Sequence, residues 1–197
     1  MFSHRIDQFV DYLRAERGCS DQTVRAYVGD LHQFQDHLEE VGGDPEIDPG
    51  EIALTDLRGF VASRFEENEA SSIARKISTL RSFYSFLVKK ELVEDNPAAL
   101  LSSPKVSRPL HNFFNVDEIF DLLDRHSPDD ALGQRDMAIW EVGYGSGLRA
   151  SELVSLDLED IDLDEGWIMV EGKGNKQRQV PLGRKAKKAL DTYLESR

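Results

Sequence analysis

The sequence has little cysteine, no long apolar run and fewer basic than acidic residues. Cys19 is the single cysteine among 197 residues, which excludes an intrachain disulfide framework and favours a reducing compartment. No apolar stretch approaches the ~20 residues that a membrane-spanning helix requires. Charged residues within Met1–Asp7 come too early for a signal peptide. We therefore expect a cytoplasmic protein with no membrane partner.

The chain is acidic overall, but its charge is unevenly distributed. It has 37 Asp and Glu against 24 Lys and Arg, a net charge of −13, which excludes a uniformly basic nucleic-acid coat. Three basic segments nevertheless contain no acidic residue: Ala70 to Lys90, Lys105 to Arg108, and Gly172 to Leu190. A single such run is more often a solvated helix face. Three of them favour a protein that meets a polyanion on one face.

The length allows two small domains, and one segment is typical of a linker. Residues 102–109 contain two prolines and three serines, a composition that suits an exposed connection. The sequence therefore predicts a helical domain over 1–103, a linker over 104–109 and a second domain over 110–197. The expected fold class is mainly α, with a small α+β second domain.

Apolar periodicity supports this division. Apolar residues at helical spacing predict four helices in the first domain, near 6–13, 24–38, 57–65 and 73–87. In the second domain the pattern predicts helices from residue 115, around 137–142 and over 150–156, then a hairpin of strands 167–170 and 179–182, then a basic helix.

A glycine-rich stretch, Gly143 to Leu153, is followed some twenty residues later by Gly172 to Lys176. Its glycines read G-x-G-x-G after a helical pattern, which does not fit a dinucleotide site, and Gly172-Lys173 lacks the Ser or Thr of a phosphate-binding loop. The five histidines have no zinc-ligand spacing. We expect no metal and no other cofactor.

Three charged residues in this stretch form a candidate site. Arg149 follows a tight glycine turn, where its guanidinium can hold two oxygens of a phosphate. Glu152 lies three residues later on the same helical face and can fix the rotamer of Arg149. Lys173 stands at a hairpin tip between two glycines, as a point charge or proton donor. An isolated arginine in a glycine turn is, however, more often structural.

The segments Gly147 to Leu153 and Gly172 to Leu182 together resemble the core of tyrosine site-specific recombinases, the phage integrase family, of the Xer type. Thr23 to Tyr27 and Ala74 to Tyr84 resemble that family's helical SAM-like core-binding domain. Arg135 to Ala138 resembles the XerC branch slightly more than the XerD branch. The resemblance extends over essentially the whole chain, but it corresponds to the N-terminal two-thirds of such a recombinase.

The resemblance implies a reaction without metal or cofactor. In this family a tyrosine attacks the scissile phosphate, which gives a 3′-phosphotyrosyl intermediate, and fixed cations stabilise the charge that grows on the phosphate oxygens. Arg149 and Lys173 then correspond to catalytic residues, with Lys173 as the general acid, and Glu152 supports Arg149. The family acts as a tetramer on double-stranded DNA, so the implied partners are DNA and a second Xer-type subunit.

The chain departs from the family pattern at its C-terminal end. The family's His-x-x-Arg motif and its nucleophilic tyrosine belong beyond Arg197, and none of the five tyrosines matches the nucleophile. We therefore expect a fragment that binds DNA without cleaving it, from a recombinase that resolves chromosome dimers or integrates mobile elements. The alternatives are a non-catalytic regulator or decoy of a full-length recombinase, and an acidic protein-interaction module.

The expected DNA contacts are basic residues of the acid-free segments and of the second predicted helix. Most would touch phosphate. In the first domain they are Arg25, Arg75, Lys76, Arg81, Lys89 and Lys90, and in the second Lys176 and Arg178.

Overall fold

The computed structural model describes residues 1–106, 113–124, 130–172 and 176–197. The chain forms two compact units, Met1–Pro109 and Leu110–Arg197, and each has its own hydrophobic core. In the described part of the chain, no helix is long and apolar enough to cross a bilayer, and no group of His, Cys, Asp and Glu side chains is arranged to hold a metal ion.

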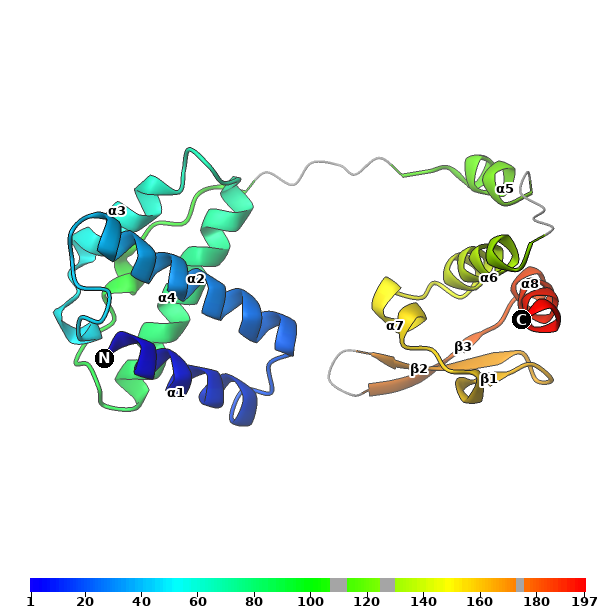
Figure 1. Ribbon diagram of the computed structural model, residues 1–197, viewed down its shortest axis with the longest axis horizontal. Helices are drawn as coiled ribbons and strands as arrows, with labels where there is room; N and C mark the ends of the chain where they lie inside the picture. Colours follow the sequence, from blue (N-terminus) through cyan, green and yellow to red (C-terminus); the bar gives the residue numbers. More distant parts are fainter. Residues whose placement is uncertain (107–112, 125–129, 173–175) are drawn as a thin grey trace. The chain divides into compact units, whose positions relative to one another are not determined.

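The first unit is helical throughout its described residues, as the apolar periodicity predicts (Figure 1). Its four long helices are α1 (Phe2–Ala15), α2 (Asp21–Glu40), α3 (Leu54–Ser63) and α4 (Ala70–Lys89). A 3₁₀ turn, η1 (Pro49–Glu51), lies between α2 and α3, and a second, η2 (Pro97–Leu100), follows α4. Helix α2 begins after Ser20, whose side chain accepts a hydrogen bond from the backbone N–H of Thr23 and so satisfies one of the unpaired donors of the first turn.

Aromatic rings fill the core of the first unit. Phe2 lies between Phe34 and Phe83, with ring centroids 5.8 and 5.3 Å away, and Phe34 in turn contacts Phe60 edge-on at 5.3 Å. Tyr84 is fully buried, and its hydroxyl donates to the Pro49 carbonyl at 3.2 Å. Tilted and edge-on pairs of this kind stabilise a core beyond the area they bury, so the helices of this unit share one well-packed interior.

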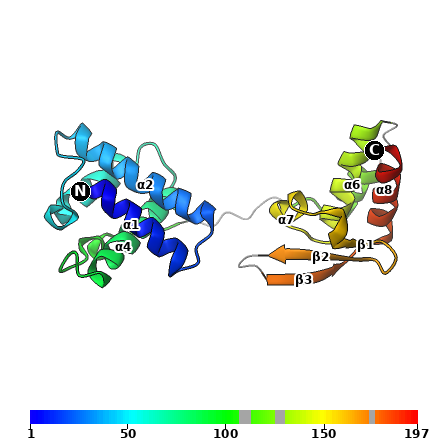
Figure 2. The same cartoon turned by 60° about the horizontal axis from the view of Figure 1, so that its bottom comes forward.

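The second unit combines helices with a small antiparallel sheet (Figure 2). Its elements are α5 (Val116–Asp124), α6 (Ala131–Gly145), α7 (Ala150–Val154), η3 (Leu158–Asp160), β1 (Ile161–Asp162), β2 (Trp167–Gly172), β3 (Lys176–Pro181) and α8 (Arg184–Ser196). The predicted hairpin is confirmed, with Ile168 opposite Val180 and Gly172 opposite Lys176. The two-residue strand β1 was not predicted, and α6 begins several residues earlier than its apolar pattern indicates.

The core of the second unit lies between α6, α8 and one face of the sheet. Val142 of α6, Ile168 and Val170 of β2 and Leu190 of α8 are all buried there. Tyr193 is partly buried against the same core. Because β2 alternates buried and exposed positions, the residues of β3 paired with Ile168 and Val170 also point toward the helices. One of them is Arg178.

Candidate phosphate-binding cluster and nucleic-acid interface

A left-handed glycine connects α6 to α7. Gly147 has φ +62°, a conformation that glycine adopts at little cost and that residues with a Cβ rarely adopt. The backbone N–H of Leu148 donates to the Gly143 carbonyl at 3.1 Å, and the Ser146 hydroxyl donates to the Pro181 carbonyl at 2.9 Å. The turn is thus tied to the end of β3, and it places Arg149 at the N-cap of α7.

Glu152 is the centre of a charged cluster on α7. Its carboxylate accepts from the Arg149 backbone N–H at 2.9 Å and from Arg149 Nη1 at 2.7 Å. Arg178 of β3 donates to both of its oxygens, from Nη1 to Oε1 at 2.7 Å and from Nη2 to Oε2 at 2.9 Å. Only 3% of the Glu152 side chain is exposed. Such a buried carboxylate is tolerated because each oxygen has at least two donors.

The cluster carries a net positive charge and presents it to solvent. Hydrogen bonds from Arg178 first, and then from Arg149, hold the pKa of Glu152 well below its usual range. In return, the bonded carboxylate raises the pKa of Arg178. Two guanidinium groups and one carboxylate leave one positive charge, and 69% of the Arg149 side chain is exposed. In this arrangement Arg149 can donate hydrogen bonds to a phosphate oxygen.

The predicted contact between Glu152 and Arg149 is present, and Arg178, which was predicted to contact DNA, is bound to the same carboxylate. The Arg178 guanidinium donates to both oxygens of Glu152, and 39% of its side chain is exposed. Its position on β3, two residues before the inward-facing Val180, already indicated the core side of the sheet. Gly172 contributes space, because a Cβ there would lie 3.3 Å from Arg178 Nη1 and 3.6 Å from Glu152 Oε1.

The other two predicted residues of the second unit are placed differently. Lys173, the predicted general acid, lies outside the described residues. Lys176 begins β3 opposite Gly172, and its side chain is exposed. It therefore remains available to a polyanion.

Four of the predicted contacts in the first unit are accessible. Arg25 is exposed on α2. Arg75 of α4 is 43% exposed and donates to the Asp30 carboxylate and, at 3.4 Å, to the Ala26 carbonyl. Lys89 and Lys90 are also exposed, although both form ion pairs with Glu16, at 2.7 and 2.8 Å. Exposed ion pairs of this kind are weak, so these lysines can exchange Glu16 for a phosphate.

Lys76 and Arg81, both predicted to contact DNA, have hydrogen-bond partners within the protein. Only 4% of the Lys76 side chain is exposed, and its ammonium group donates to Asp30 at 3.2 Å and to Gln33. Arg81 is partly buried and donates to the backbone carbonyls of Ala98, at 3.3 Å, and of Leu101. It thereby holds η2 against α4. Counting charges over a segment of the sequence does not reveal hydrogen-bond partners that are distant in the sequence.

Sequence reasoning missed Asp30, the partner of Lys76. Its side chain is 2% exposed and accepts from Arg75, from Lys76 and from the Thr79 hydroxyl, the last at 2.8 Å. The signal was available, because Asp30 lies on the apolar stripe of α2 between Tyr27 and Phe34. A carboxylate on such a stripe requires a buried partner.

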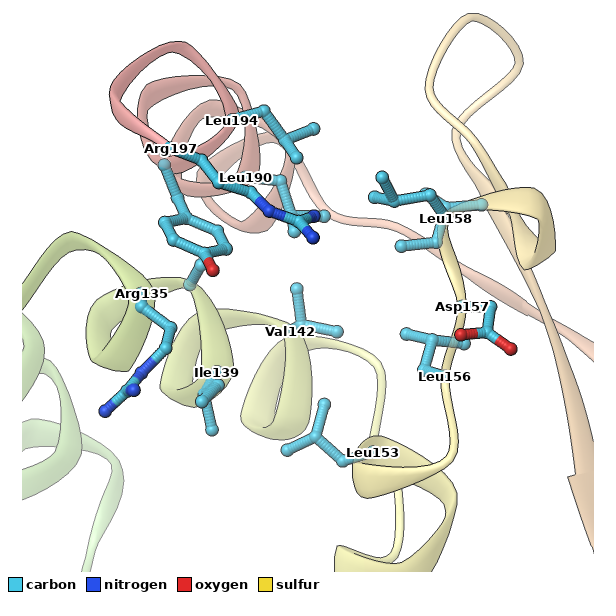
Figure 3. Close-up of a pocket in the computed structure, with 13 residues that line it drawn as sticks. Arg135, Ile139, Val142, Leu153, Leu156, Asp157, Leu158, Leu190, Leu194 and Arg197 are labelled. Atoms are coloured by element: carbon cyan, nitrogen blue, oxygen red, sulfur yellow. The ribbon is translucent and has the colours of Figure 1, made fainter. Parts of the chain in front are cut away.

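The second unit also has an apolar groove of about 300 Å³ between α6, α7 and α8 (Figure 3). Ile139 and Val142 of α6, Leu153 of α7 and Leu190 and Leu194 of α8 contribute to its lining. Leu153 faces this groove whereas its neighbour Glu152 faces Arg178. One side of α7 therefore lines the apolar groove, and the other carries the charged cluster.

Comparison with known proteins agrees with this geometry. Residues 6–91 match the family described as "Phage integrase, N-terminal SAM-like domain", and residues 112–197 match the "Phage integrase family". The chain is 42% identical over 98% of its length to the tyrosine recombinase XerC of Thermodesulfovibrio yellowstonii and 43% identical over 96% to that of Oceanobacillus iheyensis. It is 38% identical over 96% of its length to the tyrosine recombinase XerD of Listeria monocytogenes.

The match covers part of each relative. The chain spans 62% of both XerC proteins and 64% of the XerD protein.

Solved structures share the fold at lower sequence identity. A lambda integrase dimer bound to a COC′ core site superposes with a TM-score of 0.71 at 21% identity, over 98% of this chain and 54% of that one. The Tn1549 transposon integrase in complex with a circular intermediate DNA superposes with a TM-score of 0.70 at 15% identity, over 98% and 65%. On the combined evidence of both matched domains and of the Xer relatives, the chain belongs to the phage integrase family of tyrosine recombinases.

Proposed function

We propose that this chain is the DNA-holding part of a site-specific tyrosine recombinase and that it supplies two of the cationic groups of the reaction. The observation that carries the proposal is the Arg149 guanidinium, 69% exposed and fixed by a buried carboxylate. A fixed cation with solvent-facing donors is what a transferring phosphoryl group requires, because negative charge grows on its oxygens. The XerC and XerD names of the relatives support the same function.

In this proposal each part of the chain has a role. Residues 1–103 form a DNA-binding domain, residues 104–109 a linker and residues 110–197 the first part of a catalytic domain. Arg149 stabilises the scissile phosphate, and Lys173 protonates the leaving 5′-oxygen. The exposed residues Arg25, Arg75 and Lys176 contact the DNA backbone. Lys89 and Lys90 join them when DNA displaces Glu16.

The names of the Xer relatives support a proposal for the biological setting. The complete recombinase acts in the cytoplasm as a tetramer on double-stranded DNA, with a second Xer-type subunit, and resolves chromosome dimers. This chain alone does not cut DNA, because none of its tyrosines lies where the family has its nucleophile. In this proposal the chain contributes affinity for the duplex, and it supplies the cationic groups Arg149 and Lys173 of the active site.

Fluorescence anisotropy with a labelled duplex tests the binding. Each neutralised phosphate lowers the log of the affinity by about 0.9 per log unit of salt. With the exposed cations named above, we expect a slope of about −3 to −5 between roughly 50 and 200 mM salt. An affinity that does not change over this range would contradict the proposal. The variant Arg25→Gln should bind more weakly and lower the slope by about one.

A suicide substrate tests the absence of cleavage. We expect no covalent protein–DNA adduct on a denaturing gel under conditions in which a full-length Xer recombinase forms one. An adduct formed by this chain alone would mean that one of its own tyrosines is a nucleophile.

A further inference from the structure

We propose that Arg178 is a positioning residue, which aligns Arg149 through Glu152 and does not itself contact DNA. The inference rests on the proposed function in one respect, namely that the target of Arg149 is a DNA phosphate. It differs from the expectation drawn from the sequence, in which Arg178 is one more cation along the DNA backbone. The two interpretations make opposite predictions for combined substitutions.

The hydrogen bonds assign different tasks to the two arginines. Arg178 approaches Glu152 with both Nη atoms, one to each carboxylate oxygen, at 2.7 and 2.9 Å. Such a fork fixes the plane of the carboxylate as well as its position. Arg149 makes one side-chain bond, from Nη1 to Oε1 at 2.7 Å. The orientation of Arg149 therefore depends on a carboxylate that Arg178 holds in place.

Exposure supports the same division. The Arg149 side chain is 69% exposed, whereas that of Arg178 is 39% exposed and faces the helices. A residue that presents a cation to a ligand needs to be exposed to solvent. A residue that holds another side chain in place needs to face the interior of the unit. Gly172, opposite Lys176 at the end of β2, keeps a Cβ away from the Arg178 guanidinium and from Glu152.

Charge gives a second reason for Arg178. A pair made of Arg149 and Glu152 alone would be neutral and would attract a phosphate poorly. With Arg178 the cluster keeps one positive charge, and the buried carboxylate remains compensated. Because Arg178 lies on β3 and Glu152 on α7, the same bonds join the hairpin to the turn that carries Arg149. A displacement of the hairpin would be transmitted to Arg149.

A double-mutant cycle on DNA affinity tests the inference. We expect Arg149→Ala to weaken binding about tenfold, as for the loss of one charge-assisted hydrogen bond. Arg178→Lys keeps the charge but cannot form the fork, and it should weaken binding by a similar factor. The double variant should bind within about twofold of Arg149→Ala, because both substitutions remove the same contact. Effects that multiply would show an independent DNA contact and overturn the inference.

The control is Arg184→Gln, which removes an exposed arginine at the start of α8 in the same unit. This variant shares no partner with the cluster, and its effect should multiply with that of Arg149→Ala. If this pair were also non-additive, the cycle would not be specific to Arg178 and the inference would fail.

A second measurement does not depend on DNA. In ¹⁵N–¹H spectra of the free chain, the Nε–Hε group of Arg149 should be ordered and slow to exchange. Arg178→Lys and Glu152→Gln should both make it mobile, whereas Arg184→Gln should leave it unchanged. An Arg149 signal that is the same in all variants would overturn the inference. If the chain bound no DNA at all, the proposed function would fail, and this measurement would still decide the role of Arg178.

Discussion

His37 shows how burial changes the chemistry of a single residue. It lies on α2 with its ring 5.7 Å from that of Phe60, and it is buried. Burial first, and the nearby Arg64 second, lower its pKa from the ordinary value of 6.5, while Glu40 acts in the opposite direction. The folded chain therefore keeps this imidazole neutral at a pH at which the unfolded chain would protonate it.

The lowered pKa predicts a loss of stability in mild acid. Below pH 6.5 the unfolded state binds a proton at His37 that the folded state does not bind, so the free energy of unfolding falls as the pH falls from 6.5 toward the folded pKa. Urea denaturation of the first unit, followed by circular dichroism at pH 7.5 and 5.5, measures this change.

The variant His37→Gln is the control for this experiment, because its side chain does not titrate. We expect a smaller difference in stability between the two pH values than in the unmodified chain. Carboxylates with lowered pKa values, such as Glu16 at about 2, lose their contribution below about pH 4.5 and do not interfere. An equal pH dependence in both proteins would show that His37 is not the responsible group.

At the scale of elements, the contact between α2 and α4 contains a buried ion pair. Asp30 and Lys76 are 2% and 4% exposed and lie 3.2 Å apart, and Thr79 and Arg75 complete the hydrogen bonding of the carboxylate. Loss of one partner leaves the other charge buried and unpaired, which costs more than the pair contributes.

We therefore predict that Asp30→Ala destabilises the first unit by about 3–5 kcal/mol. The double variant Asp30→Leu/Lys76→Met should recover most of this loss, because it removes both charges and leaves apolar volume. Urea denaturation of the full chain measures both. A double variant as unstable as Asp30→Ala would mean that the ion pair itself, rather than the unpaired lysine, determines the packing of α2 on α4.

The elements were more predictable from the sequence than the partners of the charges. Apolar periodicity placed the four long helices of the first unit and the β2–β3 hairpin, because that signal is local in the sequence. The partners of Lys76 and Arg178 were not predicted, because Asp30 and Glu152 are 46 and 26 residues away. In both cases the face of the element carried the missing information, since each residue lies on the side that packs against the core.

At the scale of the molecule, the division of the chain into two compact units predicts a preferred site of proteolysis. Residues 102–106 have no helix or strand, and Lys105 is exposed. Limited trypsin digestion should therefore cut first after Lys105 and give two fragments that resist further cleavage, with boundaries that mass spectrometry identifies. First cuts within α2 or α4 would contradict the proposed division into domains.

The net charge of −13 describes the whole surface but not the candidate DNA contacts. Family membership and the order of the domains were predictable, because short motifs such as Gly147 to Leu153 are specific in combination. The partner of each basic side chain was not predictable from the sequence, because it depends on how deeply that side chain is buried in the fold. Of the predicted site residues, Arg25, Arg75, Lys89, Lys90, Lys176 and Arg149 are exposed, whereas Lys76 is buried.

The two separate cores also bear on how such a protein changes over evolutionary time. The aromatic interior of the first unit and the core around Val142 and Ile168 are separate clusters, so we expect substitutions in one cluster to affect stability independently of substitutions in the other. In the proposed function, the surfaces of α2 and α4 can change, and with them the DNA contacts, while the Arg149–Glu152–Arg178 cluster stays constant. Exchange of a whole unit between relatives would combine the first unit of one protein with the second unit of another.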